Sequence, residues 1–118
     1  TRTYIYNKAF YEALIAEPTH NNVEIFDLIR QWAKEKGILD KGDAKTQLIK
    51  LYEETGELSQ SLLKNDKEGI IDAIGDSVVV LTNLAELNGV SIETCMQSAY
   101  DEISSRTGRM VNGTFVKD

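Results

Sequence analysis

The stretch DAKTQLIKLYEETGELSQSLLKNDKEGIIDAIGDSVVVLTNLAEL, residues 43–87, decides the fold of this chain. Its first half repeats apolar residues at steps of three and four, which predicts an amphipathic helix from a cap at Asp43 to about Lys64. Its second half, from about Lys67 to Leu87, is apolar around most of its circumference, which predicts a helix buried on nearly every side. The short polar break between the halves allows the two helices to fold back on each other as an antiparallel pair.

Acidic residues occupy mirrored positions in these two helices. In an antiparallel pair, residues whose numbers add to the same value lie at the same height, as do Glu53 with Asp76 and Glu57 with Asp72. Clustered carboxylates raise each other's pKa unless a cation neutralises them, so the pattern predicts a site for a hard divalent metal such as magnesium. A solvated acidic face is the alternative for the first helix, but it does not suit acids on an otherwise buried second helix.

The remaining segments complete an all-α fold, an antiparallel bundle of about five helices in a single domain over residues 1–118. Apolar periodicity predicts three further helices, over residues 4–16, 22–37 and 91–106. Residues 1–20 are expected to form either a helix or an arm for oligomerisation. Asn112-Gly113 between short apolar runs predicts a C-terminal hairpin or extended tail. Gly75, within the apolar helix, predicts a close approach of another helix beside Asp76.

Composition favours a soluble cytoplasmic protein. The net charge of −6 argues against a protein that grips polymeric nucleic acid, because that affinity depends on clustered Lys and Arg. The single cysteine, Cys95, excludes an intramolecular disulfide and is expected to be a small core residue. The sequence shows neither an uncharged apolar run of membrane-spanning length nor a secretory signal, so no membrane partner is expected.

The acidic segments resemble the MazG-like branch of the all-α nucleoside triphosphate pyrophosphohydrolases. The family's first motif, Glu-Glu-x-x-Glu, is matched by Glu53, Glu54 and Glu57. Its second motif is Glu-x-x-Asp, and Asp76 matches the final acid. Ala73 stands where the family has glutamate, and Asp72 is the candidate substitute, although one helical position rotates a side chain by about 100°. The resemblance extends from about Trp32 to the end of the chain.

The resemblance implies a magnesium-dependent enzyme, with manganese able to replace magnesium, that cleaves a nucleoside triphosphate into the monophosphate and pyrophosphate. It also implies a homodimer or homotetramer. The expected metal ligands are Glu53, Glu57, Asp72 and Asp76. Glu54, which we expect to one side of this quartet, is the candidate general base and alternatively a further metal ligand.

Further residues are candidates for binding the nucleotide. The cations that suit phosphate are Lys50, Arg106, Arg109 and Lys117, each of which is alternatively an ordinary surface charge. Trp32 can stack on a base or pack in the core. Gln47 and Asn83 can read base or sugar edges or serve as polar packing between helices.

Other functions remain open at this level. The first is a pyrophosphatase of the same superfamily specialised for dUTP or dCTP. The second, which the missing glutamate at Ala73 favours, is a catalytically weak regulator that binds nucleotide or metal. The third is a purely structural module for helical dimerisation.

Overall fold

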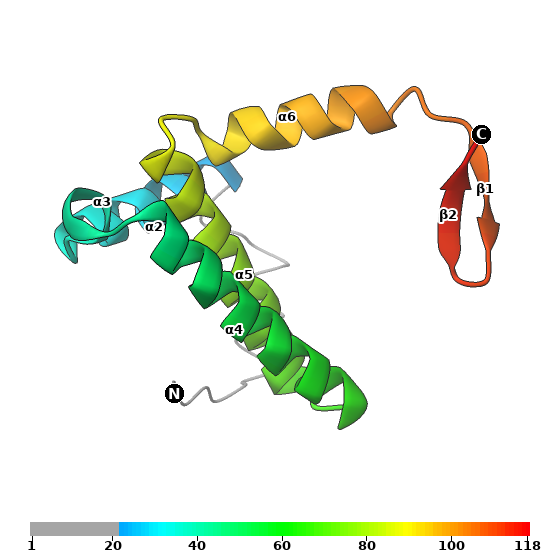
Figure 1. The fold of residues 1–118 in the computed structure, drawn as a ribbon, viewed down its shortest axis with the longest axis horizontal. Coiled ribbons are helices and arrows are strands. Elements are labelled where there is room, and N and C mark those ends of the chain that lie inside the picture. Colours follow the sequence, from blue (N-terminus) through cyan, green and yellow to red (C-terminus); the bar gives the residue numbers. More distant parts are fainter. Residues whose placement is uncertain (1–21) are drawn as a thin grey trace.

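The structure is a computed structural model that describes residues 22–118, so the helix predicted over residues 4–16 and the possible arm over 1–20 lie outside the described residues. The elements are α2 (Asn22–Glu35), α3 (Ile38–Lys41), α4 (Ala44–Leu63), α5 (Lys67–Leu87), α6 (Ile92–Ile103), β1 (Gly108–Val111) and β2 (Thr114–Lys117) (Figure 1). The all-α fold class with a C-terminal hairpin is confirmed. None of the described helices combines the length and the apolar character needed to cross a lipid bilayer.

The antiparallel pair of α4 and α5 is the framework of the bundle (Figure 1). Both helices begin at side-chain caps: Asp43 accepts a hydrogen bond from the backbone N–H of Thr46 (2.9 Å), and Asp66 accepts one from that of Gly69 (3.1 Å). Each cap satisfies an N–H group that has no partner inside its own helix. Asn65, with φ of 54°, turns the chain between the helices in the left-handed region that asparagine tolerates.

The short helix α3 connects α2 to α4. Gly37 lies between α2 and α3 with φ of 79°, a left-handed conformation that glycine adopts without strain. Four residues are too few to show a helical period, so the sequence pattern did not predict α3. The expected number of about five helices is therefore reached among the described residues through α3 and not through the segment 4–16.

One side of α5 is left uncovered by the described residues of the chain. Its buried residues are Ala73, Val80, Thr82, Asn83 and Ala85. By contrast, Ile74, Val78 and Leu81 are 51%, 36% and 38% exposed. The prediction of burial on nearly every side is thus wrong for one chain, because the other described elements cover only part of the helix. Gly75 is exposed as well, and a Cβ atom there would meet no described atom within 4 Å, so the predicted close helix approach is not found among residues 22–118.

The arm, which consists of α6 and the β1–β2 hairpin, stands away from the bundle of α2–α5 (Figure 1). Ser91, at which the predicted helix over residues 91–106 begins, is the N-cap of α6, and the helix ends at Ile103, before the predicted end near residue 106. The strands pair antiparallel about Asn112 and Gly113, whose φ values of 49° and 84° suit a type I′ turn. No residue of α6 or of the two strands is buried. The prediction of a core position for Cys95 is therefore wrong for the single chain.

A cluster of ion pairs around Arg30 joins the root of the arm to the bundle. The Arg30 guanidinium of α2 donates to both carboxylate oxygens of Glu93 in α6, at 2.7 and 2.6 Å, and to Asp27 in its own helix at 2.6 Å. The carboxylate of Glu86 in α5 lies 3.7 Å from the same guanidinium. The hydrogen bonds raise the pKa of Arg30 and lower that of Glu93. Because bidentate charged pairs are strong and directional, this cluster ties three helices at one point.

The caps give a test of what holds the helical pair together. Replacing Asp66 by alanine should lower the free energy of unfolding by about 1 kcal/mol, because α5 loses the acceptor for its Gly69 N–H. Urea denaturation followed by circular dichroism measures this loss. Asp40→Ala, at an exposed position inside α3, is the control and should change stability by less than about 0.5 kcal/mol. Equal losses in the two variants would show that the cap does not stabilise the pair.

Candidate active site

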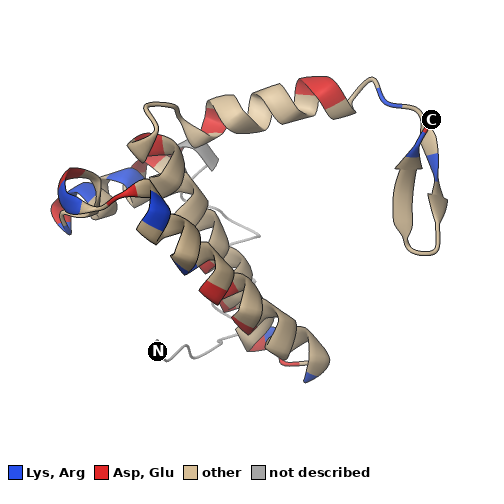
Figure 2. Cartoon of the chain, viewed as in Figure 1, with Lys and Arg blue, Asp and Glu red and all other residues tan. Residues whose placement is uncertain are grey.

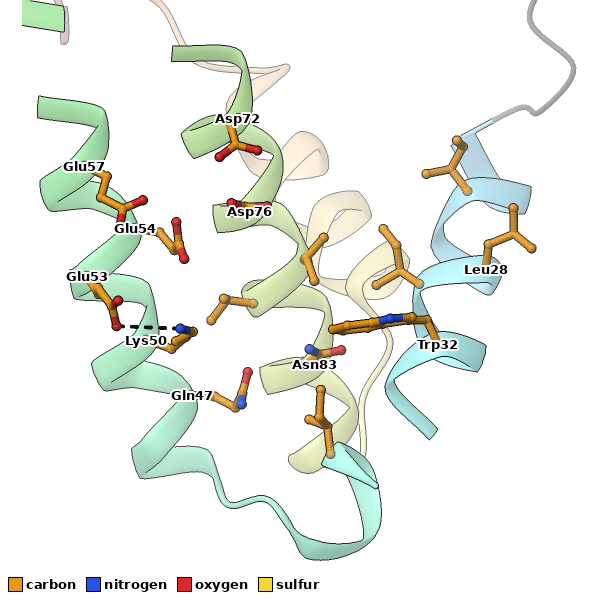
Figure 3. A pocket seen from close by; sticks show the side chains of 15 residues that line it. Leu28, Trp32, Gln47, Lys50, Glu53, Glu54, Glu57, Asp72, Asp76 and Asn83 are labelled. Atoms are coloured by element: carbon orange, nitrogen blue, oxygen red, sulfur yellow. Dashed lines mark ion pairs between the residues drawn. The ribbon is translucent and has the colours of Figure 1, made fainter. Parts of the chain in front are cut away.

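A pocket of about 780 Å³, of the size that takes a small molecule, lies between α2 and α4 and over α5 (Figure 3). Its polar lining residues are Gln47, Lys50, Glu53, Glu54, Glu57, Asp72, Asp76 and Asn83. Its apolar lining residues are Ile25, Leu28, Ile29, Trp32, Ile38, Val79 and Val80. The acids predicted on two separate helices therefore open into one cavity.

The polar residues of the pocket fall into two groups (Figure 3). The carboxylate end comprises Glu53, Glu54, Glu57, Asp72 and Asp76. The amide end comprises Gln47, Asn83 and the ring of Trp32. The antiparallel direction of α4 and α5 explains this division, because the acids precede Asn83 along α5 but follow Gln47 along α4.

Glu54 is the central acid of the carboxylate end. It is only 8% exposed, and its Oε2 atom is buried without a hydrogen-bond partner among residues 22–118. Glu53 is at the margin, with a side chain that is 56% exposed and a carboxylate 3.7 Å from Lys50 Nζ. We expected Glu54 to one side of the acidic group, but neighbouring helical residues point about 100° apart, and the orientation of α4 places Glu54 inward instead.

Burial raises the pKa of the Glu54 carboxyl above its ordinary value, and the nearby carboxylates of Glu57 and Asp76 raise it further, while Lys50 acts in the opposite direction. An ionised Glu54 is therefore unfavourable unless a proton or a cation compensates it. Carboxylate oxygens are the donors that a hard cation such as magnesium prefers, so the chemistry of this end fits such an ion. Among residues 22–118, no three His, Cys, Asp or Glu side chains are already arranged as a coordination set.

The position at which the family motif has glutamate is filled by a buried methyl group. Ala73 is 2% exposed and is not among the residues that line the pocket. Asp72 does line the pocket. Its position is compatible with its predicted role as the substitute acid, which stays a prediction.

The amide end offers an aromatic face and an unsatisfied acceptor. Trp32 is 45% exposed and lines the pocket, so it is not enclosed in the core. Asn83 is 2% exposed, and its Oδ1 atom is buried with no hydrogen-bond partner in the described part of the chain. Aromatic rings stack on nucleobases, and amides hydrogen-bond to their edges. This end therefore has the two features that hold a base.

Sequence reasoning missed the apolar wall of the pocket as part of the site. Ile25 and Ile29 belong to the apolar residues at helical spacing in the predicted helix over residues 22–37, and this spacing is the signal that marks them. That signal does not reveal that α4 leaves the face uncovered. Ile38 belongs to the unpredicted helix α3, so its place in the pocket had no signal in the pattern.

The predicted phosphate ligands of the arm lie outside the pocket. Arg106, Arg109 and Lys117 are not among the lining residues, and Figure 2 shows the cations of the arm far from the acids of α4 and α5. Arg106 instead pairs with Glu102 at 2.8 Å. Of the four predicted phosphate-binding cations, the structure brings Lys50 to the pocket of its own chain.

The raised pKa of Glu54 has a measurable consequence for stability. The folded chain binds this proton more tightly than the unfolded chain, so the associated stability is complete below the ordinary pKa of glutamate and is lost as the pH rises through the raised value. Glu54→Gln removes the loss, so in metal-free buffer the variant should gain stability over the wild type as the pH rises from about 4 to 7. Urea denaturation at the two pH values measures the gain.

The matched control is Glu68→Gln, which replaces an exposed acid in the first turn of α5. A carboxylate in that position interacts favourably with the helix N-terminus, so this variant should show no gain at pH 7. If the two variants gained equally, burial of Glu54 would not be the cause.

Comparison with known proteins identifies the family. The family model for the MazG nucleotide pyrophosphohydrolase domain matches residues 43–111. An uncharacterised 18.2 kDa protein from the rep-hol intergenic region of Haemophilus phage HP1 (strain HP1c1) is 40% identical over 62 residues, which are 52% of this chain and 38% of that protein. No solved structure matches the chain significantly. The matched range covers more than half of the sequence and includes both acidic helices, and the chain therefore belongs to the MazG nucleotide pyrophosphohydrolase family.

Proposed function

We propose that this protein hydrolyses a nucleoside or deoxynucleoside triphosphate to the monophosphate and pyrophosphate, with magnesium or manganese as cofactor, in the cytoplasm. The observation that carries the proposal is the two-ended pocket, in which a group of carboxylates around Glu54 faces the same cavity as Trp32 and Asn83. One end suits the metal-bound phosphates of a nucleotide and the other suits its base. Family membership supports the same reaction class.

The reaction requires water to attack the α-phosphorus. A bond forms between the water oxygen and this phosphorus, the bond from the phosphorus to the oxygen that bridges to the β-phosphate breaks, and pyrophosphate leaves. The proton of the water passes to a carboxylate. Glu54 is suited to accept it, because its raised pKa brings the basicity of the carboxylate closer to neutral pH.

The other acids of the carboxylate end hold the cation in this proposal. Glu57 and Asp76 are the inner ligands, since both lie close enough to Glu54 to raise its pKa. Glu53 and Asp72 also line the pocket and complete the candidate set. When bound, magnesium would offset the negative charge that develops on the phosphate oxygens. Lys50, which also lines this part of the pocket, supplies a further positive charge.

The amide end and the apolar wall position the nucleoside. Stacking on Trp32 would hold any base, because every base has an aromatic face. The amide of Asn83 can pair with a neighbouring donor and acceptor on the base edge, and Gln47 lines the same end. The side chains of α2 make this wall apolar, so the nucleoside would lie against nonpolar groups on that side.

Product analysis tests the reaction. The purified protein with magnesium should convert nucleoside triphosphates to monophosphate and pyrophosphate, separated by ion-exchange chromatography, with no diphosphate product. Glu57→Gln and Asp76→Asn should each lower turnover at least a hundredfold, because each removes one oxygen ligand, while the helical circular dichroism stays unchanged. Glu68→Gln does not alter the pocket and should keep full activity. A Glu57→Gln protein as active as the Glu68→Gln control would remove Glu57 from the site.

Binding can be measured separately from turnover. Trp32 is the only tryptophan in the sequence, so its fluorescence reports directly on the pocket. A non-hydrolysable triphosphate analogue should change this emission, and in Asn83→Ala the analogue concentration that gives half of this change should rise at least tenfold, because the base loses its hydrogen-bond partner. A wild-type protein that bound the analogue but released no pyrophosphate would be a nucleotide-binding regulator instead of an enzyme.

A further inference from the structure

The sequence contains two Asn-Gly pairs, Asn88-Gly89 directly after α5 and Asn112-Gly113 in the turn of the β1–β2 hairpin. An asparagine that precedes glycine is prone to lose its side-chain amide, because glycine has no side chain to shield its backbone nitrogen. All four residues are exposed. Exposure therefore does not distinguish the two pairs, but their hydrogen bonds do.

Loss of the amide is an intramolecular reaction followed by the addition of water. The backbone nitrogen of the glycine attacks Cγ of the asparagine, a C–N bond forms, and the bond from Cγ to Nδ2 breaks. Ammonia leaves with the proton of the glycine N–H, and a cyclic imide remains. Water then opens the imide at either carbonyl, which gives aspartate or isoaspartate. The reaction therefore requires a glycine N–H that can lose its proton and a backbone that can bring the nitrogen against Cγ.

Both reacting groups of Asn88-Gly89 are held by hydrogen bonds. The Gly89 N–H donates to the carbonyl oxygen of Glu86 at 3.0 Å. The side-chain amide of Asn88 donates to the carbonyl oxygen of Leu84 at 2.7 Å. Gly89, with φ of 74°, is the left-handed residue that ends α5. An attack within this pair must break both bonds at the end of the helix.

The corresponding groups of Asn112-Gly113 are not held in this way. Among residues 22–118, neither the side-chain amide of Asn112 nor the N–H of Gly113 makes a hydrogen bond. The pairing of the hairpin begins outside the turn, where Val111 is the partner of Thr114. The amide that leaves and the N–H that loses its proton are thus both exposed and without a partner in the described chain.

The hairpin also opens more easily than the end of α5. It is a single two-stranded sheet with four residues in each strand, none of them buried. A hairpin of this kind is marginally stable in water, whereas α5 is held by the buried residues Ala73, Val80 and Ala85. Segments with few buried contacts open locally at low free energy. The hairpin can therefore reach the backbone conformation that the attack requires.

We infer that Asn112 is a site of spontaneous deamidation in the folded protein, and that its isoaspartate product unpairs the hairpin. Isoaspartate carries the chain through Cβ and Cγ, which adds one atom to the backbone of a two-residue turn. Because this turn sets the register of the strands, the pairing of Val111 with Thr114 is lost. Aspartate, by contrast, suits the turn and keeps the pairing. The inference is independent of the proposed function.

Isotope labelling and peptide mapping test the site. The purified chain is incubated at mildly alkaline pH in water enriched in heavy oxygen and then digested in ordinary water, so only deamidation during the incubation carries the label. Trypsin cleaves after Arg109 and Lys117, and in the peptide 110–117 only Asn112 has a side-chain amide. Mass spectrometry should show that Asn112 is labelled at least about tenfold faster than Asn88, because two hydrogen bonds protect Asn88-Gly89.

The same chain unfolded in urea is the matched control. Unfolding removes the hydrogen bonds at the end of α5, so the two asparagines should then deamidate at similar rates. If the difference persisted in urea, neighbouring residues and not the fold would cause it, and the inference would be wrong. A folded chain in which Asn112 stays unlabelled, or in which Asn88 is labelled as fast, overturns the inference as well.

NMR spectroscopy tests the effect on the hairpin. Isoaspartate in the incubated protein is quantified by methylation with an isoaspartyl methyltransferase. The cross-strand contacts between Val111 and Thr114 should weaken in proportion to the isoaspartate content, while the signals of α4 and α5 stay unchanged. Freshly purified Asn112→Asp carries the charge without the longer backbone, so it should keep these contacts. Contacts that persist in isoaspartate-rich protein, or that are already lost in Asn112→Asp, contradict the inferred unpairing by isoaspartate.

Discussion

The buried carboxylate of Glu54 is the constraint on which the rest of the site depends. The chain places an acid between two packed helices, and the residues that the structure describes provide no hydrogen-bond partner for its Oε2 atom. A buried carboxylate without a partner lowers the free energy of unfolding, so folding alone does not account for its position. The antiparallel pairing of α4 and α5 overcomes this cost through side-chain caps at Asp43 and Asp66 and the packing of the two helices. The framework is thus stable enough to hold a group that is satisfied only when a proton or a cation arrives.

The apolar wall contributed by α2 strengthens the electrostatic interactions of the carboxylates. Ile25, Leu28 and Ile29 line the pocket opposite α4, so charges in the cavity interact through a partly apolar surrounding. Electrostatic interactions are stronger there than in open water. Trp32, on the same helix, lines the pocket together with Asn83 of α5. A single helix face therefore serves the acids at one end of the cavity and the aromatic ring at the other.

Features that depend on local residue chemistry could be predicted from the sequence. The caps of α4 and α6, the ends of α5 and the Asn112-Gly113 turn follow from side chains that act on their own backbone, and the structure contains each of them. The acids of both helices also reach one cavity, because the numbers of paired residues determine their height in an antiparallel pair.

Features that depend on how whole elements meet could not be predicted in the same way. Glu53 and Glu54 are chemically identical neighbours, and only the rotation of α4 against α5 decides which of them is buried. The burial of α5 depends on how many elements surround it, and the hydrophobic periodicity of its sequence does not report that number. The position of Trp32 in a pocket instead of the core depends on the gap between α2 and α4. The cations of the arm show the largest difference between expectation and structure, because a helical pattern predicts α6 but not the direction in which it leaves the bundle.

The direction of α6 relative to the bundle depends on Arg30, which lies where the arm joins the bundle. The guanidinium joins α2 to Glu93 in the first turn of α6 and lies near Glu86 at the end of α5, so it holds the angle between the bundle and the arm. The hairpin follows the opposite end of α6 (Figure 1). A small rotation of α6 about the Arg30 ion pairs therefore displaces the hairpin much further than it displaces the start of the helix. The ion pairs of this one guanidinium with Glu93 of α6 and Glu86 of α5 resist such a rotation, although no residue of α6 or of the hairpin is buried.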